Sequence, residues 1–134
     1  EMAKEAPTVT VAVDDSGGSA RSIENDITSV DWAIPRAVQD VTGIDKAAIE
    51  RLLLLSDFSL TMNGVFNDAS NVSHDTFKAV ASATASRTIT IVTSGQTLAT
   101  ECFITDYAMS RGSDGSLTWT VPAVLQSGTA PTWA

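Results

Sequence analysis

The stretch DYAMSRGSDGSLTWTVP, Asp106 to Pro122, carries the clearest structural signal in the chain. Asp114 and Gly115 form the dipeptide typical of a tight hairpin turn, because that turn needs a backbone conformation that glycine tolerates. After the turn, apolar residues alternate with hydroxyl residues, which is the pattern of a strand with one buried face. We therefore expect a core-facing set and an outward-facing set, namely Leu117, Trp119 and Val121 inside, and Ser116, Thr118 and Thr120 outside.

Similar strand patterns recur along the chain and are separated by polar or glycine-rich turns. They cover residues 8–13, 25–35, 36–43, 57–66, 87–93 and 97–109. Within them we expect an irregularity near Ser29 and a bulge or bend at Gly64. Pro35 limits how centrally the end of its segment can lie in a sheet, because proline donates no backbone hydrogen bond.

Two segments favour helix instead. Ser73 is a suitable N-cap for a helix whose face would carry Phe77, Val80, Ala81 and Thr84. A second, short helix is predicted from Asp45 to Leu53. The sequence thus predicts a mainly β fold, a β-sandwich or partly rolled barrel with one flanking α-helix and a short helix in a long loop. With 134 residues, no internal repeat and no linker, we expect a single domain over residues 1–134.

Composition and charge exclude several classes of function. The net charge is −8, and the eight lysine and arginine residues are scattered, so we expect neither a module that grips nucleic-acid phosphates nor a polybasic membrane anchor. No stretch is long and apolar enough to cross a bilayer. The N-terminal EMAKEAPT has no apolar signal region, so we do not expect secretion by that route.

Residues that could carry chemistry are few. His74, the only histidine, stands between Ser73 and Asp75, but sequence neighbours on a helix do not point at each other, so they form no triad. Cys102, the only cysteine, has an apolar setting that predicts a buried residue rather than a reactive thiol. One histidine and one cysteine do not suggest a metal site, and there is no phosphate-binding or dinucleotide motif. The sequence therefore predicts no enzyme and no cofactor.

The strand edges suggest another kind of function. An exposed edge associates with other chains unless charge, proline or a covering segment blocks it. RTITIVT (87–93) and SLTWTVP (116–122) contain few such blocking residues. An open edge can pair with an identical neighbour, and head-to-tail contacts of that kind close into a ring or continue as a filament.

From about Val38 to the C-terminus, the sequence resembles the major tail tube proteins of long-tailed bacteriophages. The shared features come in the family's order, although each alone is weakly specific. They are DVTG at 40–43, D-x-S-L-x-x-x-G-x-F from Asp57, a helix opening with His74, a strand opening on Arg87, the hairpin described above, and a final P-x-W ending at Trp133.

This resemblance implies a structural protein rather than an enzyme. Members of the family form hexameric rings, stacked into a tube through which double-stranded DNA passes without specific binding. The implied partners are further copies of the chain and tail proteins such as the tape measure and the tail terminator. The implied location is the virion tail, after assembly in the host cytoplasm. The alternative is the tube of a gene transfer agent or contractile injection particle, or a small β-sandwich decoration or receptor-binding module.

Two sets of candidate residues follow. We expect residues 36–55 to form an arm whose inter-subunit contacts are Val38, Val41, Ile44, Leu52 and Leu53; the other interpretation is that these residues complete the core. The outward face of the hairpin is a candidate for the lumen, because short neutral hydroxyls offer DNA little to hold; its residues are Ser116, Thr118 and Thr120. An acidic wall would also repel DNA, but the sequence does not decide which carboxylates would form it among Asp14, Asp15, Asp57, Asp68, Asp106 and Asp114.

Overall fold

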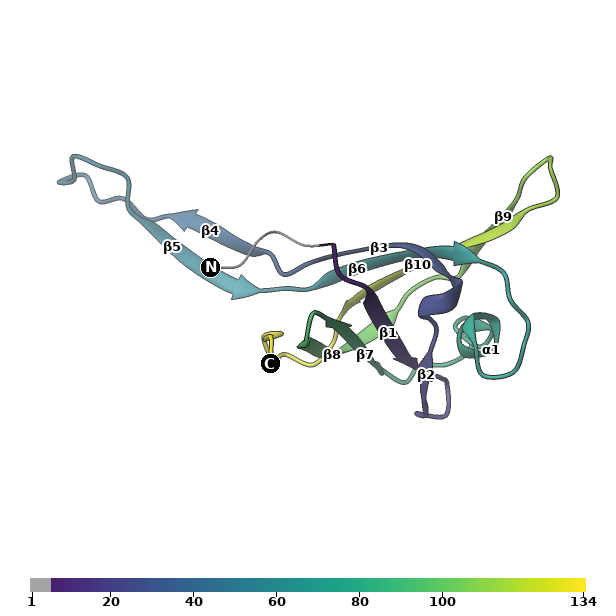
Figure 1. Ribbon diagram of the computed structural model, residues 1–134. Coiled ribbons are helices and arrows are strands. Elements are labelled where there is room, and N and C mark those ends of the chain that lie inside the picture. The colour runs from purple at the N-terminus through teal and green to yellow at the C-terminus, as the bar shows by residue number, and fades with distance from the viewer. Residues whose placement is uncertain (1–5) are drawn as a thin grey trace.

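The computed structural model describes residues 6–134, which form a mainly β structure with one short α-helix (Figure 1), as predicted. The expectation about a secretion signal falls mostly on residues 1–5 and so lies outside the described residues. The strands are β1 (Val9–Asp14), β2 (Ala20–Ser22), β3 (Ile27–Ala33), β4 (Arg36–Asp40), β5 (Arg51–Ser56), β6 (Ser59–Val65), β7 (Arg87–Thr93), β8 (Gln96–Ile104), β9 (Ala108–Arg111) and β10 (Leu117–Leu125). The helices are the 3-10 helix η1 (Glu24–Asp26) and the α-helix α1 (Ser73–Phe77).

Most strands belong to one antiparallel sheet that rolls over on itself. Its order is β2-β1-β7-β8-β10-β6-β3, and β9 is added beside β10. Strand β8 pairs with β7 along residues 96–102 but with β10 only along 102–104, so the sheet turns at β8. Strands β1 and β7 thereby lie across the core from β3, β6 and β10 (Figure 1). Because β2 and β3 at the two ends do not pair, the roll is partial and no barrel closes.

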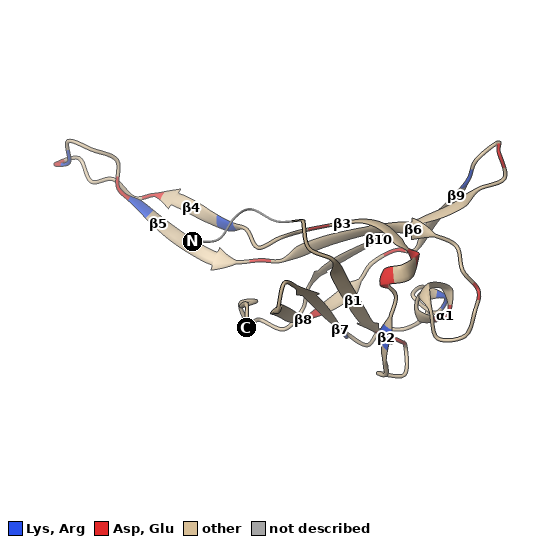
Figure 2. Cartoon of the chain, viewed as in Figure 1, with Lys and Arg blue, Asp and Glu red and all other residues tan. Residues whose placement is uncertain are grey.

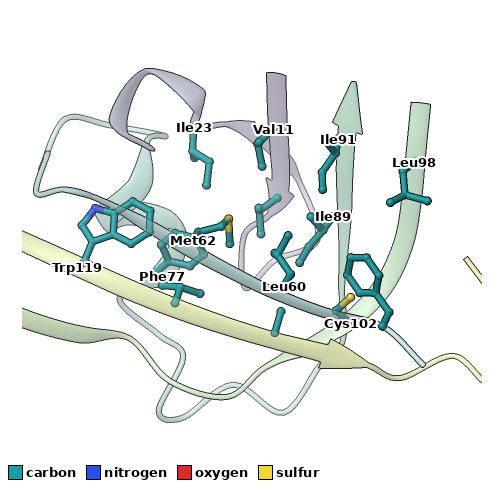
Figure 3. Close-up of a cluster of buried hydrophobic side chains, with 14 residues drawn as sticks. Val11, Ile23, Leu60, Met62, Phe77, Ile89, Ile91, Leu98, Cys102 and Trp119 are labelled. Carbon is teal, nitrogen blue, oxygen red and sulfur yellow. The ribbon is translucent and has the colours of Figure 1, made fainter. Parts of the chain in front are cut away.

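The core fills the space between the two halves of this sheet (Figure 3). Alternate apolar side chains of β1, β7 and β8 point toward those of β6 and β10, as the strand period requires. The fully buried residues include Val11, Val13, Ile89, Ile91 and Leu98 on one side and Leu60, Met62, Trp119, Val121 and Ala123 on the other. The expected alternation in β10 is confirmed, with Trp119 and Val121 buried and Thr118 exposed, while Leu117 is only half-buried at the start of the strand.

Gly64 provides the space that Trp119 needs. A Cβ atom at Gly64 would lie 2.4 Å from Trp119 Cζ2 and 2.3 Å from the Asp26 carbonyl oxygen. Strand β6 runs through Gly64 without interruption, so the predicted bulge there is wrong. The irregularity lies in the partner strand, where Thr28 is an extra residue between Ile27 and Ser29, close to the expected position. The glycine is required by the close approach of its neighbours and not by a bend.

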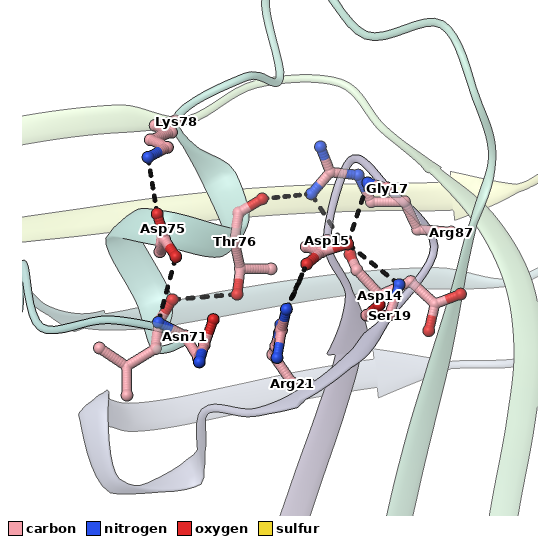
Figure 4. Close-up of polar contacts among 11 residues, drawn as sticks. Asp14, Asp15, Gly17, Ser19, Arg21, Asn71, Asp75, Thr76, Lys78 and Arg87 are labelled. Carbon is pink, nitrogen blue, oxygen red and sulfur yellow. Dashed lines mark hydrogen bonds and ion pairs between the residues drawn. The ribbon is translucent and has the colours of Figure 1, made fainter.

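Helix α1 is held on the body by two buried polar groups. Asp26 accepts hydrogen bonds from the backbone N–H of Ser73 (3.2 Å) and the side chain of Asn67 (2.9 Å). At the other end, Arg87 Nη1 donates to the Thr76 carbonyl oxygen at 2.5 Å (Figure 4). Burial lowers the pKa of Arg87, an effect that the carboxylates of Asp15 and Asp14 oppose.

The helix is shorter than the sequence predicted. It ends at Phe77 and not near Thr84, and its N-cap is Val72 and not Ser73. The Thr76 carbonyl oxygen accepts a bond from the Arg87 side chain, while the Val80 N–H bonds to Phe77, and turns replace the helix. A tertiary contact thus stands at the point where an element that local spacing would have continued comes to its end.

The predicted short helix from Asp45 to Leu53 is wrong. Residues 42–50 form a loop of turns and bends, and β5 begins at Arg51. The leucines of β5 pair across to β4, with Val38 opposite Leu53 and Gln39 opposite Leu52. Cross-strand pairing overrides the helical propensity of leucine here, as tertiary context often does.

The predicted hairpin turn and the C-terminal residues both tie the sheet together. Gly115 has the positive φ of 94° that the turn was expected to need, and the Gly112 N–H donates to the Ser116 carbonyl oxygen at 2.8 Å.

At the C-terminus, Thr97 and Ala134 exchange two backbone hydrogen bonds of 2.8 Å beside a bridge between Leu98 and Trp133. Trp133 also packs against Trp32, with ring centroids 6.3 Å apart.

Candidate assembly surfaces

A long hairpin projects from the body and ends far from it (Figure 1). Strands β3 and β4 run out along one side, and β5 and β6 return along the other, with a break at Ile34–Pro35. The Asp57 N–H donates to the Pro35 carbonyl oxygen at 2.9 Å, so the pairing continues across the break. We call the outer part, residues 36–56, the arm.

The tip of the arm is closed by the DVTG residues. The Asp40 carboxylate accepts bonds from both the N–H (3.0 Å) and the hydroxyl (2.5 Å) of Thr42. These bonds lower the pKa of Asp40 below its ordinary value. The same hydroxyl accepts a bond from the Glu50 N–H at 2.8 Å, which ties the two sides of the loop together. These contacts account for the spacing of Asp40 and Thr42 in the motif, because an aspartate carboxylate reaches the N–H and the hydroxyl of a threonine two residues later.

The arm is apolar and exposed in the isolated chain. All five predicted contact residues are exposed, in part or fully: Val38 (56%), Val41 (45%), Ile44 (108%), Leu52 (52%) and Leu53 (51%). None of them belongs to the core, so the other interpretation, that they complete it, does not hold for this chain. Ile49 and Leu55 are exposed as well, at 61% and 91%. The exposure of Leu55 could have been predicted from the run of four leucines, because successive residues of a strand face opposite sides and the four cannot all face one core.

The four leucines also line an open hollow on the arm. Together with Arg36 they surround about 580 Å³ of space. Arg36 is held there by a 2.8 Å hydrogen bond from its Nε to the Leu54 carbonyl oxygen. An exposed apolar surface of this kind marks a site of protein contact more often than a solvent face.

A second surface is the outward face of the layer β3-β6-β10-β9, which contains the predicted lumen residues. Thr118 stands between Val65 of β6 and Ser110 of β9, and Thr120 between Asn63 and Ala108. The Thr120 hydroxyl donates to Asn63 Oδ1 at 2.8 Å. Ser116 lies just before β10 in the turn, where its N–H and hydroxyl bond to Asp114. The structure thus places Thr118 and Thr120 on one face and Ser116 at its margin.

Charge is nearly absent from this face. Strands β6 and β10 contain no charged residue (Figure 2). Asp31 on β3 is the exception, because it lies opposite Thr61 and therefore on the same side as Asn63 and Thr120. Sequence reasoning missed Asp31 as a carboxylate of this face. The alternation of Val30, Trp32 and Ile34 around it was the available signal.

This layer has a free edge on each side within the described chain. Strand β3 is the last strand of the sheet on one side, and β9 pairs only with β10 on the other. Neither strand has a proline, and between them the charged residues are only Asp31 and Arg111. Both edges are therefore available for strand pairing with another chain.

His74 and Cys102, the two residues that could have carried chemistry, are each held in place by contacts with neighbouring side chains or by burial. His74 Nδ1 lies 3.1 Å from the Tyr107 hydroxyl, and the imidazole packs on Phe66 with ring centroids 4.8 Å apart. Cys102 is buried, as predicted, and burial raises its pKa to about 11. Among residues 6–134, no three histidine, cysteine or acidic residues come together in a way that could hold a metal ion. Nor does any helix in this part of the chain have the length and apolarity to span a membrane.

Comparison with known proteins gives a match of fold. No protein family and no curated protein matches the sequence. A chain in the tail of an empty GTA particle with C6 symmetry has a TM-score of 0.77 and 14% identity, covering 94% of this chain and 95% of that chain. A chain in the virion of a native gene transfer agent (GTA) particle has a TM-score of 0.73 and 14% identity, over 92% of this chain and 95% of that chain.

A third similar structure comes from another kind of particle. A chain in the six-fold symmetrised cryo-EM structure of the anti-feeding prophage (AFP) baseplate has a TM-score of 0.68 and 12% identity, covering 100% of this chain and 97% of that chain. At sequence identities this low, a structural match shows a shared fold and does not show a shared function. The expected assignment to long-tailed phages in particular is not shown by these matches. The chain shares its fold, over nearly its whole length, with chains of GTA and prophage particles.

Proposed function

We propose that this protein is the repeating subunit of a tail tube, in a particle of the gene transfer agent or injection type. The observation that carries the proposal is the match, over 94% of the chain, to a chain in a tail with C6 symmetry. The similar structures favour this form of the proposal over the tail of a long-tailed phage, which is the second candidate. In either case the role is structural, and six copies would form each ring.

The surface of the isolated chain supports association. A compact protein of 14.0 kDa is expected to expose about 6,700 Å². This chain exposes 8389 Å², about a quarter more. A typical stable interface buries roughly 800 Å² on each partner. An exposed area above that of a compact monomer is expected for a subunit that neighbouring copies cover.

Ring formation would use the two free edges of the layer β3-β6-β10-β9. If β9 of one subunit pairs with β3 of the next, near residues 31–33, the layer continues from copy to copy. Such a contact joins two different surfaces, so it closes into a ring when the rotation between copies allows. The expected contact residues of the arm, Val38, Val41, Ile44, Leu52 and Leu53, would then be covered by neighbouring subunits in the same ring or the next.

A continuous layer of this kind would present its outward face to the lumen. Thr118, Thr120 and, at the margin, Ser116 offer no positive charge, so DNA phosphates would find no partner to bind. Asp31 would add one negative charge for each subunit. Double-stranded DNA would pass without specific binding, and a tape measure and a tail terminator would be the other partners of the tube in the virion.

The arm gives a test of this function that leaves the fold intact. Leu53 is half-exposed in the isolated chain, so Leu53→Asp should not affect folding but should place a charge in the inter-subunit contact. In sedimentation velocity experiments we expect the wild type to form large species with rising concentration, and the variant to remain small. Leu60→Asp, on β6 and buried, is the control that should unfold the protein. Unimpaired assembly of Leu53→Asp would contradict a contact role for the arm.

A further inference from the structure

We propose that the groove between β1 and β3 is the docking site for the arm of a second copy of this chain, with Arg51 of the arm against Glu24 of the groove. This inference rests on the proposed function, because it names the surface of one subunit that receives the arm of another.

The groove lies where the sheet fails to close. Val9 and Val11 of β1 line one side and residues 27–30 of β3 the other, around about 280 Å³ of space. Strand β3 is the last strand of the sheet, so its wall is a strand edge, whereas β1 pairs with β2 from Ala12 onward and its Val11 carbonyl oxygen accepts the Ile23 N–H, which leaves only the start of β1 as an edge. The walls combine the apolar residues Val9, Val11, Ile27 and Val30 with the polar residues Glu24, Thr28 and Ser29. A mixed slot of this kind beside a strand edge suits the side chains of an added strand.

Glu24 marks this groove as incomplete in the isolated chain. Its side chain lines the groove, and its Oε2 atom is buried without a hydrogen-bond partner among the described residues. A buried carboxylate oxygen is stabilised by a charged donor, and arginine supplies the strongest such contacts. The occupant of the groove should therefore present a cation to Glu24 and apolar side chains to the valines and Ile27.

The arm has this chemistry. Strand β5 begins with Arg51, which is exposed, and continues with four leucines. The ion pairs within residues 6–134 use Arg21, Lys46 and Lys78, so Arg51 is left without one in the described chain. Arg36 and Arg111 also lack an ion pair, but Arg36 Nε is bonded to the Leu54 carbonyl oxygen, and no run of apolar residues adjoins Arg111. Arg51 is therefore the arginine of the arm whose side chain has no partner among the described residues and which adjoins leucines that could enter the groove.

The contact must form between two chains. Glu24 precedes β3, whereas Arg51 lies opposite Asp40 at the far end of β4, so both strands separate the two residues. At about 3.3 Å per residue, residues 27–40 span about 45 Å. Figure 1 shows the arm extending away from the part of the body that carries the start of β3. A contact between the arm of one copy and the groove of another joins unlike surfaces and can repeat indefinitely. It uses residues 27–30 of β3 and leaves 31–33 for pairing within a ring.

A charge-swap experiment tests this pairing. Glu24→Lys and Arg51→Glu should each raise the protein concentration needed for assembly at least about tenfold, because each leaves a like-charged pair in the contact. The combined variant Glu24→Lys/Arg51→Glu should recover most of the loss. Asp68→Lys is the control, since it makes the same charge change as Glu24→Lys at an exposed residue of the loop between β6 and α1, outside the arm, the groove and both free edges, and it should assemble like the wild type. Failure of the combined variant to recover, with all variants folded by circular dichroism, would overturn the Glu24–Arg51 pairing.

A cross-linking experiment tests the groove independently of charge. The only native cysteine, Cys102, is buried, so introduced cysteines are the ones expected to react. Under mild oxidation, the variant Thr28→Cys/Leu52→Cys should give a ladder of covalent oligomers, whereas a mixture of the two single variants should give only dimers. Cross-linking of Leu52→Cys to itself would indicate arm-to-arm contact and contradict the proposal. Tubes that form without any ladder would refute the groove while leaving the tube function intact, and absence of tubes or rings from the wild type would instead reject the tube function.

Discussion

At the scale of single residues, the packing between β6 and β10 depends on one missing side chain. The Trp119 indole lies over Gly64, and its N–H donates to the Val65 carbonyl oxygen at 2.8 Å. Phe77 of α1 packs on the same indole, with ring centroids 5.4 Å apart. Gly64 therefore sets the position of Trp119, and Trp119 in turn provides the surface on which the helix lies.

We expect Gly64→Ala to destabilise the protein by about 1–3 kcal/mol, because overpacking a well-filled core forces neighbouring atoms to move. The two clashing groups are the Trp119 ring and the Asp26 backbone, neither of which is the flexible end of a side chain. Equilibrium unfolding in urea measures the effect. Gly17→Ala is the control, since its nearest new contact would be 3.4 Å away, and it should change the free energy of unfolding by less than about 0.5 kcal/mol. Equal stability of the two variants would contradict this account of Gly64.

At the scale of elements, the arm is held together by the pairing of β4 with β5 and by its tip, and not by a core. Its exposed strands form a separate two-stranded sheet, and isolated hairpins of this kind are marginally stable. The bonds of Thr42 to Asp40 and Glu50 close the loop that joins β4 to β5. The arm is thus pre-ordered before any neighbour covers it, which reduces the entropy lost on binding.

Thr42→Val removes the hydroxyl and keeps the shape of the side chain. We expect backbone hydrogen exchange in residues 41–51 to become roughly tenfold faster, because one or two hydrogen bonds of about 1 kcal/mol each are lost. The experiment is best done in the Leu53→Asp background, so that assembly does not protect the arm. Thr10→Val on β1 is the control, because the Thr10 hydroxyl makes only one long bond of 3.5 Å. Unchanged exchange at the tip would show that Thr42 does not order the arm.

The elements also show what the sequence could and could not predict. Alternation identified β10 and its two faces correctly, because a strand with one buried face imposes a period of two on its residues. Helix propensity failed at residues 45–53, where the pairing of leucines with β4 decides the structure. It failed again at the end of α1, where Arg87, ten residues beyond Phe77, donates a hydrogen bond to a carbonyl oxygen of the helix. Contacts made at long range in the chain were in each case stronger than local preference.

The same limit applies to the candidate surfaces. The run of four leucines suggested an arm over residues 36–55, with completion of the core as the open alternative, and the structure places Val38, Leu52 and Leu53 outside the core. The alternation around Asp31 indicated an outward side chain, but Asp31 was missed as part of this face because its place beside Thr61 depends on the pairing of β3 with β6. The groove between β1 and β3 could not be foreseen either, since its walls come from distant parts of the chain.

At the scale of the whole molecule, charge and shape are distributed unevenly. The outward face of β6 and β10 has no charge, and acidic residues lie mainly in loops and at strand ends (Figure 2). A chain with a net charge of −8 could have placed carboxylates on this face but has only Asp31 there. This is the arrangement expected for a wall past which DNA moves, since neither strong attraction nor close contact is favoured.

Thr118→Lys/Thr120→Lys tests the position of this face. If it lines the lumen, two lysines in each of six copies per ring would bind phosphates. We expect assembly to be preserved and DNA delivery by the particles to fall at least about tenfold, more so at low salt. Thr10→Lys/Thr90→Lys, on the outward face of β1 and β7, is the matched control and should deliver DNA normally. Normal delivery by the first variant would rule out a luminal position for the face.

The most direct test of the central claim, that this chain builds a tube, is electron microscopy of the purified protein at increasing concentration. The account predicts rings or tubes with a central channel and six-fold symmetry in end views, because the fold matches a chain of a tail with C6 symmetry and the surface exceeds that of a compact monomer. The result that would contradict it is a protein that stays monomeric at high concentration, even when the other tail proteins of its particle are added.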